Sequence, residues 1–341
     1  MQAGFEPHDF ANTMNLEAWL ALLERRHTQT IDLGLERCGS VYHRLGEPRP
    51  AKQVITVAGT NGKGSTVAYL AALCGAMGQR HGTYTSPHIF RFNERVCIMG
   101  EAVTDQTLVQ AFEQVEAARR EVSLTYFEFT TLAALLIMQQ ANLDCAILEV
   151  GLGGRLDTVN LVDTDCAVIT PIGLDHQDYL GPDLDSIAAE KAGVIRAGKP
   201  VVCTEAKPPE PVTATAAGLR SPVFRRGDDY DLEQAVEQGD DLQFRRGGQV
   251  MPVPVPGMPG AYQLDNLAAA LCTCSLLNPD FFDRQAGIAD AIRNTRVPGR
   301  LQQVGATPEI FLDVGHNTLA AGAVAAFLAN RERLGDGTVC V

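Results

Sequence analysis

The hydrophobic positions of this chain follow two spacings, one typical of helices and one typical of buried strands. Residues 15–27 alternate apolar and polar side chains at helical spacing, behind an asparagine, Asn15, that is suited to cap a helix. Residues 53–58 form a β-branched run that stops at glycines, and residues 65–77 are apolar and rich in alanine. The pattern therefore predicts one helix, followed by a strand, a glycine-rich turn and a second helix.

The alternation of short apolar runs with longer periodic segments continues along the chain. It predicts strands at residues 81–85, 145–150, 166–170 and 200–203, and helices at residues 129–140, 187–196 and 262–277. Strands that are separated by helices favour a mostly parallel sheet covered on both faces. The predicted fold class is therefore α/β, with three layers.

The character of the sequence changes in two later regions. Residues 221–256 carry charged pairs and Gly-rich turns between short alternating runs, which predict a small β insertion of hairpins, and residues 251–260 (MPVPVPGMPG) predict an extended connector. Residues 296–300 are typical of a domain linker. A strand at 309–314, a helix at 319–331 and an apolar run at 338–341 follow. Such a unit cannot bury both faces of its sheet, so we expect a first domain at 1–296 and an incomplete second domain at 297–341.

Composition narrows the class of protein. The 341 residues carry a formal net charge of −13, and no basic face is evident, so we expect no nucleic-acid partner. The nine cysteines are scattered and form no Cys-x-x-Cys pair, which predicts free cysteines in a reducing compartment. The start resembles no signal peptide, and the longest apolar stretch, residues 132–138, is too short to cross a bilayer. We therefore expect a cytoplasmic protein without a membrane partner.

The strongest motif is the glycine-rich segment after the first predicted strand. Such glycines let backbone N–H groups face phosphate oxygens, the following helix adds its positive end, and the lysine reaches the terminal phosphates. The fit to the general Walker A pattern is imperfect, because Val57 stands at the first glycine position and Gly64 at the Ser/Thr position. A glycine turn with a solvated lysine is the alternative. The predicted nucleotide-binding residues are Gly59, Thr60, Asn61, Gly62, Lys63, Gly64 and Ser65.

Three further polar side chains follow predicted strands. Glu149 ends the strand at 145–150, His176 follows the strand at 166–170, and Ser86 follows the strand at 81–85. The carboxyl ends of parallel strands meet at one edge of a sheet, where ligands of α/β proteins bind. Mg²⁺ prefers carboxylate and hydroxyl oxygens. Each residue alone has a structural alternative, but together they predict a metal site beside the phosphate loop.

These motifs resemble the folylpolyglutamate synthases of the Mur ligase superfamily. The resemblance runs from about Leu16 to the chain end. It rests on the ordered segments GTNGKGS, TSPH (85–88), LEVGLGGRLD, GLDH and EKAG (190–193). Two further segments, IDLGLER (31–37, after Thr30) and LTYFE (124–128), are similar to the pterin-binding segments of bifunctional members, which join glutamate to dihydropteroate and then extend the glutamate tail.

The resemblance implies a set of site residues that spacing alone does not. It implies one Mg²⁺ held by Ser86 and Glu149, and a second held by Glu149, His176 and Lys191, the lysine as a carbamate. It implies further nucleotide contacts at Asn266, Arg300, Asp313 and His316. It implies pterin contacts at Asp32, Leu33, Gly34, Leu35, Thr125, Tyr126, Phe127, Glu128, Leu156, Asp157 and Thr158.

The resemblance also implies the reaction. The expected enzyme uses ATP and Mg²⁺ to join L-glutamate to dihydropteroate and to folate tails through an acyl phosphate, with Lys63, Glu149, His176 and Lys191 in the catalytic centre. A monovalent cation is a further expected cofactor, and a monomer is the expected state. The family's second domain is a complete Rossmann-like unit, so the expected second domain is an incomplete version of it.

Three alternatives remain open from the sequence. A peptidoglycan Mur ligase shares the chemistry, but the segments IDLGLER and TYFE argue against it. A GTPase switch would need a guanine-reading Asn/Thr-Lys-x-Asp motif, which the sequence lacks. A fragment that binds ATP with impaired catalysis is the third alternative, because the expected second domain is incomplete.

Overall fold

A central eight-stranded sheet organises the computed structural model, which describes residues 14–27, 29, 31–234 and 242–329. The strands lie in the order β4-β3-β2-β5-β1-β6-β7-β8. All neighbours from β2 to β8 are parallel, whereas β2–β3 and β3–β4 are antiparallel. Their bounds are β1 Ala51–Ala58, β2 His81–Tyr84, β3 Val96–Ile98, β4 Glu101–Ala102, β5 Leu143–Glu149, β6 Cys166–Ile169, β7 Val201–Cys203 and β8 Val223–Arg225. The predicted mostly parallel α/β fold is confirmed.

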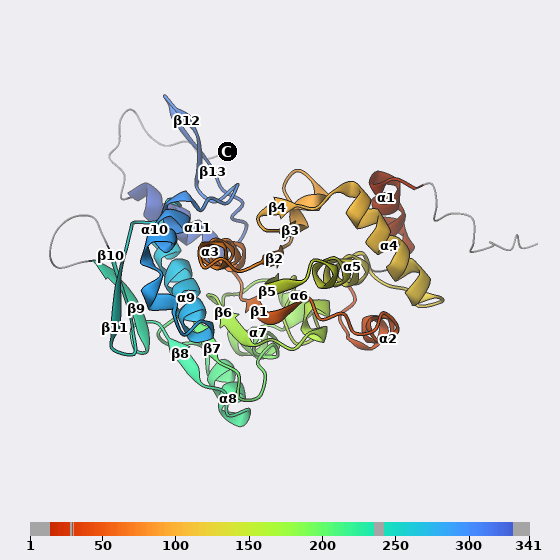
Figure 1. Ribbon diagram of the computed structural model, residues 1–341, viewed down its shortest axis with the longest axis horizontal. Coiled ribbons are helices and arrows are strands. Elements are labelled where there is room, and N and C mark those ends of the chain that lie inside the picture. The colour runs from red at the N-terminus through yellow and green to blue at the C-terminus, as the bar shows by residue number, and fades with distance from the viewer. Residues whose placement is uncertain (1–13, 28, 30, 235–241, 330–341) are drawn as a thin grey trace, which may run out of the picture.

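Successive strand residues point to opposite faces, and each face is covered by helices (Figure 1). On one face, Ile55 and Ile147 pack with residues of α3 (Lys63–Ala76), α9 (Tyr262–Leu277) and α10 (Gln285–Asn294). On the other face, Val54 and Leu148 pack with the two helices that precede β1 and the two that follow β4, while Ala58 and Ile169 pack with the helices before and after β7. These helices are α1 Leu16–Arg26, α2 Glu36–Arg44, α4 Asp105–Arg119, α5 Tyr126–Gln140, α7 Leu184–Ala192 and α8 Glu210–Gly218.

Local sequence explains several element boundaries. The Asn15 side chain accepts a hydrogen bond from the Ala18 amide at 2.9 Å, so the predicted cap is present. The Thr125 and Glu128 side chains form a reciprocal capping box, and α5 therefore begins at Tyr126 rather than at the predicted residue 129. Helix α7 ends at Ala192, four residues before the predicted end, with Gly193 as its C-cap. Short one-turn elements are η1 (Phe92–Arg95), η2 (Thr158–Leu161), η3 (Phe281–Asp283) and α6 (Gln177–Leu180).

The predicted hairpin region is partly wrong. The three antiparallel strands β9 (Tyr230–Gln234), β10 (Leu242–Arg246) and β11 (Gln249–Val253) do form a small separate sheet. Strand β8, however, pairs in parallel with β7 and extends the main sheet. It follows α8, so β7–α8–β8 is a parallel crossover unit, which short apolar runs do not distinguish from a hairpin strand. The predicted connector begins as the edge strand β11, which pairs with β10 alone.

After residue 300 the chain forms a two-stranded hairpin and a helix. The hairpin joins β12 (Gln302–Ala306), which was not predicted, to β13 (Glu309–Leu312), and helix α11 spans Thr318–Ala329. Residues 330–331 and 338–341 of the predicted elements lie outside the described residues, as do Thr28 and Thr30. The division into domains at 296 and 297 stays a prediction.

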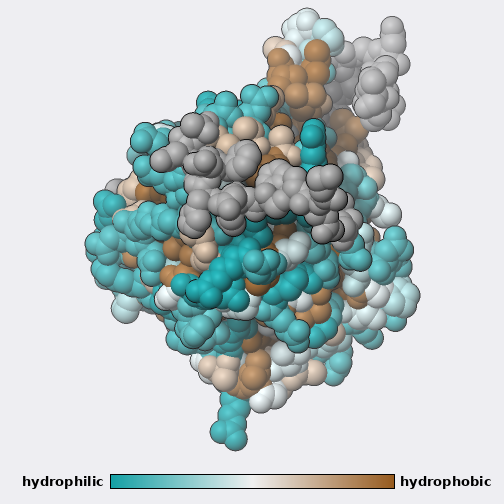
Figure 2. Space-filling view, turned by 90° about the vertical axis from the view of Figure 1, so that its right-hand side faces the viewer, coloured by the Kyte–Doolittle hydropathy of each residue, from teal (hydrophilic) through white to brown (hydrophobic). Residues whose placement is uncertain are grey.

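The polarity of the surface and the state of the cysteines in the described residues can be compared with what the composition predicts. The face over α1, α2 and α4 is mainly hydrophilic, with small scattered hydrophobic groups (Figure 2). In the described ranges, none of the helices combines the length and the apolar character that crossing a membrane needs. Eight described cysteines are free, and all of them except the half-buried Cys97 are buried, as predicted; Cys340 lies outside those ranges.

Candidate nucleotide and metal site

The phosphate loop joins the carboxyl end of β1 to the N-terminus of α3. Gly62 caps α3 with φ of +88°, a left-handed conformation that glycine adopts readily. The Lys63 Nζ atom donates to the carbonyl oxygens of Gly59 and Thr60, each at 3.1 Å, so the lysine folds back across its own loop. The Thr60 amide donates to the Pro171 carbonyl at 2.9 Å, which ties the loop to the segment after β6. The loop is thus held by hydrogen bonds to backbone carbonyl groups, within the loop and to the segment after β6.

Glu149 faces this loop from the neighbouring strand. The register of β1 against β5 pairs Val57 with Glu149, and a Cβ atom added at Gly64 would lie 3.8 Å from Glu149 Oε2. Glu149 is 5% exposed, and its carboxylate accepts a hydrogen bond from the Ser86 amide at 3.3 Å. Burial raises its pKa, and the nearby positive charge of Lys63 opposes that shift. A buried carboxylate with so few donors, beside a hydroxyl, fits a hard divalent cation.

Lys191 enters the same centre from α7. Its side chain is 4% exposed, and Nζ donates to the Gly59 carbonyl at 2.9 Å, so two lysines share that oxygen. Burial and the positive charge of Lys63 lower the pKa of Lys191 to about 7. A neutral amine is the form that reacts with CO₂, so the environment suits the carbamate that the resemblance implies.

His176, a further expected metal ligand, lies on the segment that follows β6. It caps α6 in a left-handed conformation, its side chain is 48% exposed, and Nε2 lies 3.8 Å from Asp175 Oδ1. Within the described residues, no group of three or more His, Cys, Asp or Glu side chains is placed to hold a metal ion. Hydroxyl and phosphate oxygens and water complete Mg²⁺ sites in ATP-binding proteins, so this finding does not contradict Glu149 with Ser86. The role of His176 stays a prediction.

Helix α9 closes the side of the phosphate loop. Asn266 is 2% exposed and lies against Gly62, where an added Cβ atom would stand 2.5 Å from its Oδ1. Its amide donates to Gln263 Oε1 at 3.0 Å, and Gln263 in turn donates to the hydroxyl of Ser65 at 3.3 Å. The predicted nucleotide contact at Asn266 is therefore next to the loop, and Gln263 is a buried partner that the sequence did not reveal.

The segment that precedes α11 also reaches the loop. Asn317 donates to Asp175 Oδ2 at 2.9 Å, and its carboxamide pairs with that of Asn61. Asp313 accepts from the amides of Leu301 and Gly315, which orders the turn after β13, and His316 Nε2 lies 3.8 Å from Asp175. The positive charge of Arg300 acts on both Lys63 and Glu149. The predicted residues Arg300 and His316 thus lie near the loop, while Asp313 orders the turn before His316 and, like His316, makes no hydrogen bond to the loop within the described chain.

The three predicted pterin segments converge around the first turn of α2. Arg37 forms an ion pair with Asp32 at 2.6 Å and another with Glu128 at 3.0 Å. Cys38, next to it, lies near Glu128 and Thr158. The remaining predicted contacts lie on these segments: Leu33, Leu35, Tyr126 and Phe127 are partly buried against the core, Thr125 and Thr158 are buried, and Gly34 and Leu156 are half-buried. Helix α2 was not predicted, so the sequence did not reveal that Arg37 joins two segments.

Asp157 is a buried acid of these segments. It is 3% exposed and accepts hydrogen bonds from the amides of Leu152 and Val159, each at 2.9 Å. Burial raises its pKa to about 6, although the amide donors and the charge of Lys63 oppose that shift. The carboxyl is therefore positioned by the backbone and can change protonation near neutral pH.

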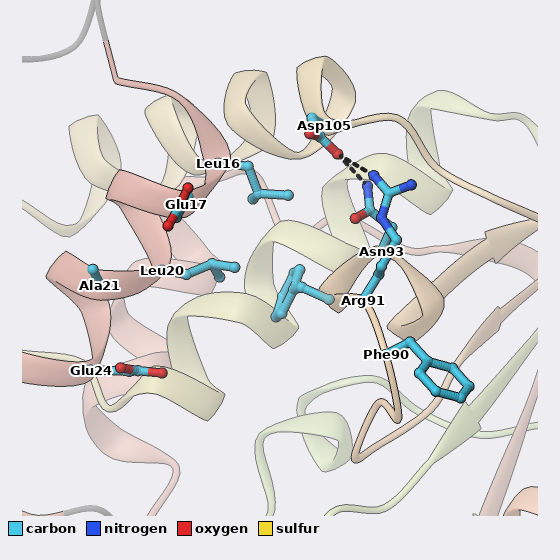
Figure 3. A pocket seen from close by; sticks show the side chains of 10 residues that line it. Leu16, Glu17, Leu20, Ala21, Glu24, Phe90, Arg91, Asn93 and Asp105 are labelled. Carbon is cyan, nitrogen blue, oxygen red and sulfur yellow. Dashed lines mark hydrogen bonds and ion pairs between the residues drawn. The ribbon is translucent and has the colours of Figure 1, made fainter.

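A separate groove lies away from the phosphate loop, between α1 and the N-terminus of α4 (Figure 3). Its volume is about 600 Å³, and an ion pair between Arg91 and Asp105 crosses one end. None of the predicted site residues lines it. Its lining is Leu16, Glu17, Leu20, Ala21, Glu24, Phe90, Arg91, Phe92, Asn93 and Asp105.

Comparisons with known proteins show what this chain is similar to. Residues 57–274 match the family described as the Mur ligase middle domain. The chain is 42% identical over 306 residues to the dihydrofolate synthase/folylpolyglutamate synthase of Escherichia coli (strain K12), an alignment covering 90% of this chain and 71% of that protein.

Solved structures give the same result. The chain is similar to Escherichia coli FolC in complex with DHPP and ADP, with a TM-score of 0.89, 40% identity, and 95% of this chain and 76% of that chain covered. It is also similar to a bifunctional folylpolyglutamate synthase/dihydrofolate synthase with Mn, AMPPNP and L-glutamate bound, with a TM-score of 0.84, 42% identity, and 94% and 75% covered.

Proposed function

We propose, from the premise that this chain belongs to the dihydrofolate synthase/folylpolyglutamate synthase family of Mur ligases, that its phosphate loop and Glu149 form the ligase centre. The chain is an ATP-dependent acid–amino-acid ligase that acts in folate metabolism, with ATP and a divalent metal as cofactors. The observation that carries the placement of the centre is the pairing of Val57 with Glu149, which puts the acid beside the loop that follows β1. A peptidoglycan ligase is disfavoured, because the similar proteins act in folate synthesis.

The reaction that fits the centre is activation of a carboxylate by phosphoryl transfer. An oxygen of the dihydropteroate or folate carboxylate attacks the γ-phosphorus of ATP, the bond to the β-phosphate oxygen breaks, and ADP leaves. The amine of L-glutamate then attacks the acyl phosphate carbon, inorganic phosphate leaves, and a proton is released as the amide forms. This chemistry depends mainly on positioning and charge stabilisation, so no nucleophilic side chain is needed.

The chain's own residues would divide these tasks. Lys63 lies across the loop and would stabilise the negative charge of the transferred phosphoryl group. Glu149 and Ser86 would hold one divalent metal, whose chemistry when bound is to neutralise phosphate charge. Glu149, His176 and a carbamate on Lys191 would hold a second. Asp32 to Leu35, Thr125 to Glu128 and Leu156 to Thr158 would enclose the pterin around α2.

The remaining proposals concern the rest of the nucleotide and the protein's surroundings. Asn266 and Arg300 would contact ATP from beside the loop, and Asp313 and His316 from the segment before α11. We further propose a cytoplasmic monomer with small-molecule substrates, a monovalent cation as an additional cofactor, and no nucleic-acid or membrane partner; the net charge of −13 supports the absence of a nucleic-acid partner. The division into a domain at 1–296 and part of a Rossmann-like domain at 297–341 is likewise proposed.

The test is substitution of Lys63 by alanine. We expect ADP release that requires both dihydropteroate and glutamate to fall by about 100-fold or more, because a preorganised positive charge at the phosphoryl group is lost. The matched control is Lys52→Ala on β1, the strand that precedes the loop, because Lys52 is exposed and pairs with Asp144 at the other end of that strand. Equal turnover of the two variants would refute the role of Lys63. A native chain that binds ATP but releases no ADP would instead support the impaired-fragment alternative.

A further inference from the structure

Arg95 is a fixed cation that the sequence analysis did not identify. It is the last residue of η1, between β2 and β3, and its guanidinium carbon lies 5.4 Å from the ring centre of Phe92 and 5.7 Å from that of Tyr126. Its Nε atom donates to His88 Nδ1 at 2.9 Å. Two aromatic rings and one hydrogen bond therefore hold the guanidinium in a single orientation.

No acidic side chain of the described residues forms an ion pair with this cation. The adjacent acid, Glu94, accepts hydrogen bonds from the amides of Ile89, Phe90 and Arg91 and is turned toward that turn of the chain. Arg95 forms no ion pair within the described ranges, and its only side-chain hydrogen bond there is the one to His88. The two outer nitrogens of the guanidinium thus keep their donors for another acceptor, and the planar pair of N–H groups matches a carboxylate.

His88, the hydrogen-bond partner of Arg95, helps to hold the guanidinium in place. His88 accepts through Nδ1, so this nitrogen carries no proton. The imidazole is therefore neutral and does not repel the guanidinium. Its ring packs edge-on to Phe92 at 5.9 Å, which completes the support of the cation.

Arg95 lies between the two halves of the proposed active site. The Thr85 amide donates to the Arg95 carbonyl at 2.9 Å, one residue before Ser86, whose amide donates to Glu149. The positive charge of Arg95 reaches Glu149. On the other side, Tyr126 belongs to a proposed pterin segment. A substrate that extends from the pterin segments to the phosphate loop would carry its reacting carboxylate past Arg95.

We propose that the Arg95 guanidinium binds the carboxylate of the pteroate-type substrate and orients it toward the phosphoryl group of ATP. The inference rests on the proposed function, because it takes the pterin and nucleotide positions from it. His88 and Phe92 act on the substrate only through Arg95 and are positioning residues, whereas Tyr126 also belongs to a proposed pterin segment. The arrangement assigns the cation to the substrate carboxylate, while Lys63 serves the phosphates.

The experiment compares two ligands on Arg95→Gln. Binding of dihydropteroate, and of its analogue with hydrogen in place of the benzoate carboxyl group, is measured by calorimetry in the presence of AMPPNP and Mg²⁺. We expect Arg95→Gln to bind dihydropteroate about 10- to 100-fold more weakly than the native chain, the range for loss of a charge-assisted hydrogen bond, and to bind the analogue with unchanged affinity. Arg95→Lys keeps the charge without the planar pair of donors, so its affinity for dihydropteroate should lie between those of the native chain and Arg95→Gln.

The control is Arg91→Gln, the same substitution four residues earlier. Arg91 is 71% exposed in its side chain and pairs with Asp105 outside the proposed site, so both affinities should equal those of the native chain. An equal loss of affinity for both ligands in Arg95→Gln would mean a structural role and would overturn the proposal, as would no loss for dihydropteroate. A native chain that binds neither ligand would refute the proposed pterin site itself, which is a distinguishable result.

Discussion

Gly62 offers a quantitative test of how the phosphate loop is built. Its φ of +88° places it in the left-handed region, and an added Cβ atom would stand 2.5 Å from Asn266 Oδ1. Asn266 cannot move freely, because it is buried and bonded to Gln263 and to the Thr66 hydroxyl. Gly62→Ala therefore combines a conformational cost of about 1–2 kcal/mol with an overpacking cost of about 1–3 kcal/mol.

Gly78 separates these two costs. It lies just beyond the other end of α3 with φ of +73°, and nothing stands within 4 Å of an added Cβ atom. An unfolding entropy of about 2.1 cal/mol/K per residue gives about 0.7 kcal/mol per degree for a chain of 341 residues. We expect Gly78→Ala to lower Tm by about 2 °C, and Gly62→Ala to lower it by about 5 °C.

The assay is thermal unfolding with and without AMPPNP and Mg²⁺. The native chain and Gly78→Ala should gain the same stabilisation from the nucleotide, whereas Gly62→Ala should gain little, because its loop amides are displaced. Adding Asn266→Ala to Gly62→Ala should recover part of the lost Tm, since the clashing atom is removed. If Gly62→Ala matches Gly78→Ala in Tm and in its response to the nucleotide, the contact with Asn266 does not shape the loop and the reasoning fails.

Two further predictions follow from displaced pKa values. The pKa of Lys191 is about 7 instead of 10.5. With labelled bicarbonate, the lysine should therefore give a ¹³C-carbamate NMR signal that strengthens as the pH rises through 7, because the amine loses its proton. An identical signal in Lys191→Arg would contradict this prediction. The pKa of Asp157 is raised from 3.8 to about 6, so folding favours its protonated form. The free energy of unfolding that this preference contributes is fully present below pH 4. It is lost as the pH rises through 6, and the loss amounts to up to about 3 kcal/mol. Denaturant unfolding should therefore show that the free energy of unfolding of Asp157→Asn rises relative to that of the native chain between pH 4 and 7. A difference between the two chains that does not change with pH would refute the shift.

Some of the elements that the sequence analysis missed carried readable signals. Helix α4 has Thr104 as an N-cap and buries Leu108, Ala111 and Val115 at helical spacing, so periodicity could have predicted it. Helix α2 is different, because Gly39 lies in its middle and only Cys38 and Val41 are buried. Its stability comes from packing against α4 and α5, which neighbouring residues along the chain do not encode.

In the candidate site, too, some residues carried a signal in the sequence and others did not. The phosphate loop, Glu149 and Ser86 were recognisable because each follows a strand in the sequence. Arg95 carried no such signal: it stands in a short turn after Glu94, and its aromatic partner Tyr126 is 31 positions away. Only the folded chain brings the two together.

The sequence by itself determined the unit of strand, glycine turn and helix around Lys63, because hydrogen bonds between near neighbours and the conformational freedom of glycine act over a few residues. The tertiary structure decided the strand order that puts β5 beside β1, the joining of two segments by Arg37, and the contact of Asn317 with Asn61 and Asp175. These depend on packing between residues far apart in the chain. The free energy that selects such packing comes from burial and pairing in three dimensions, which no local pattern records.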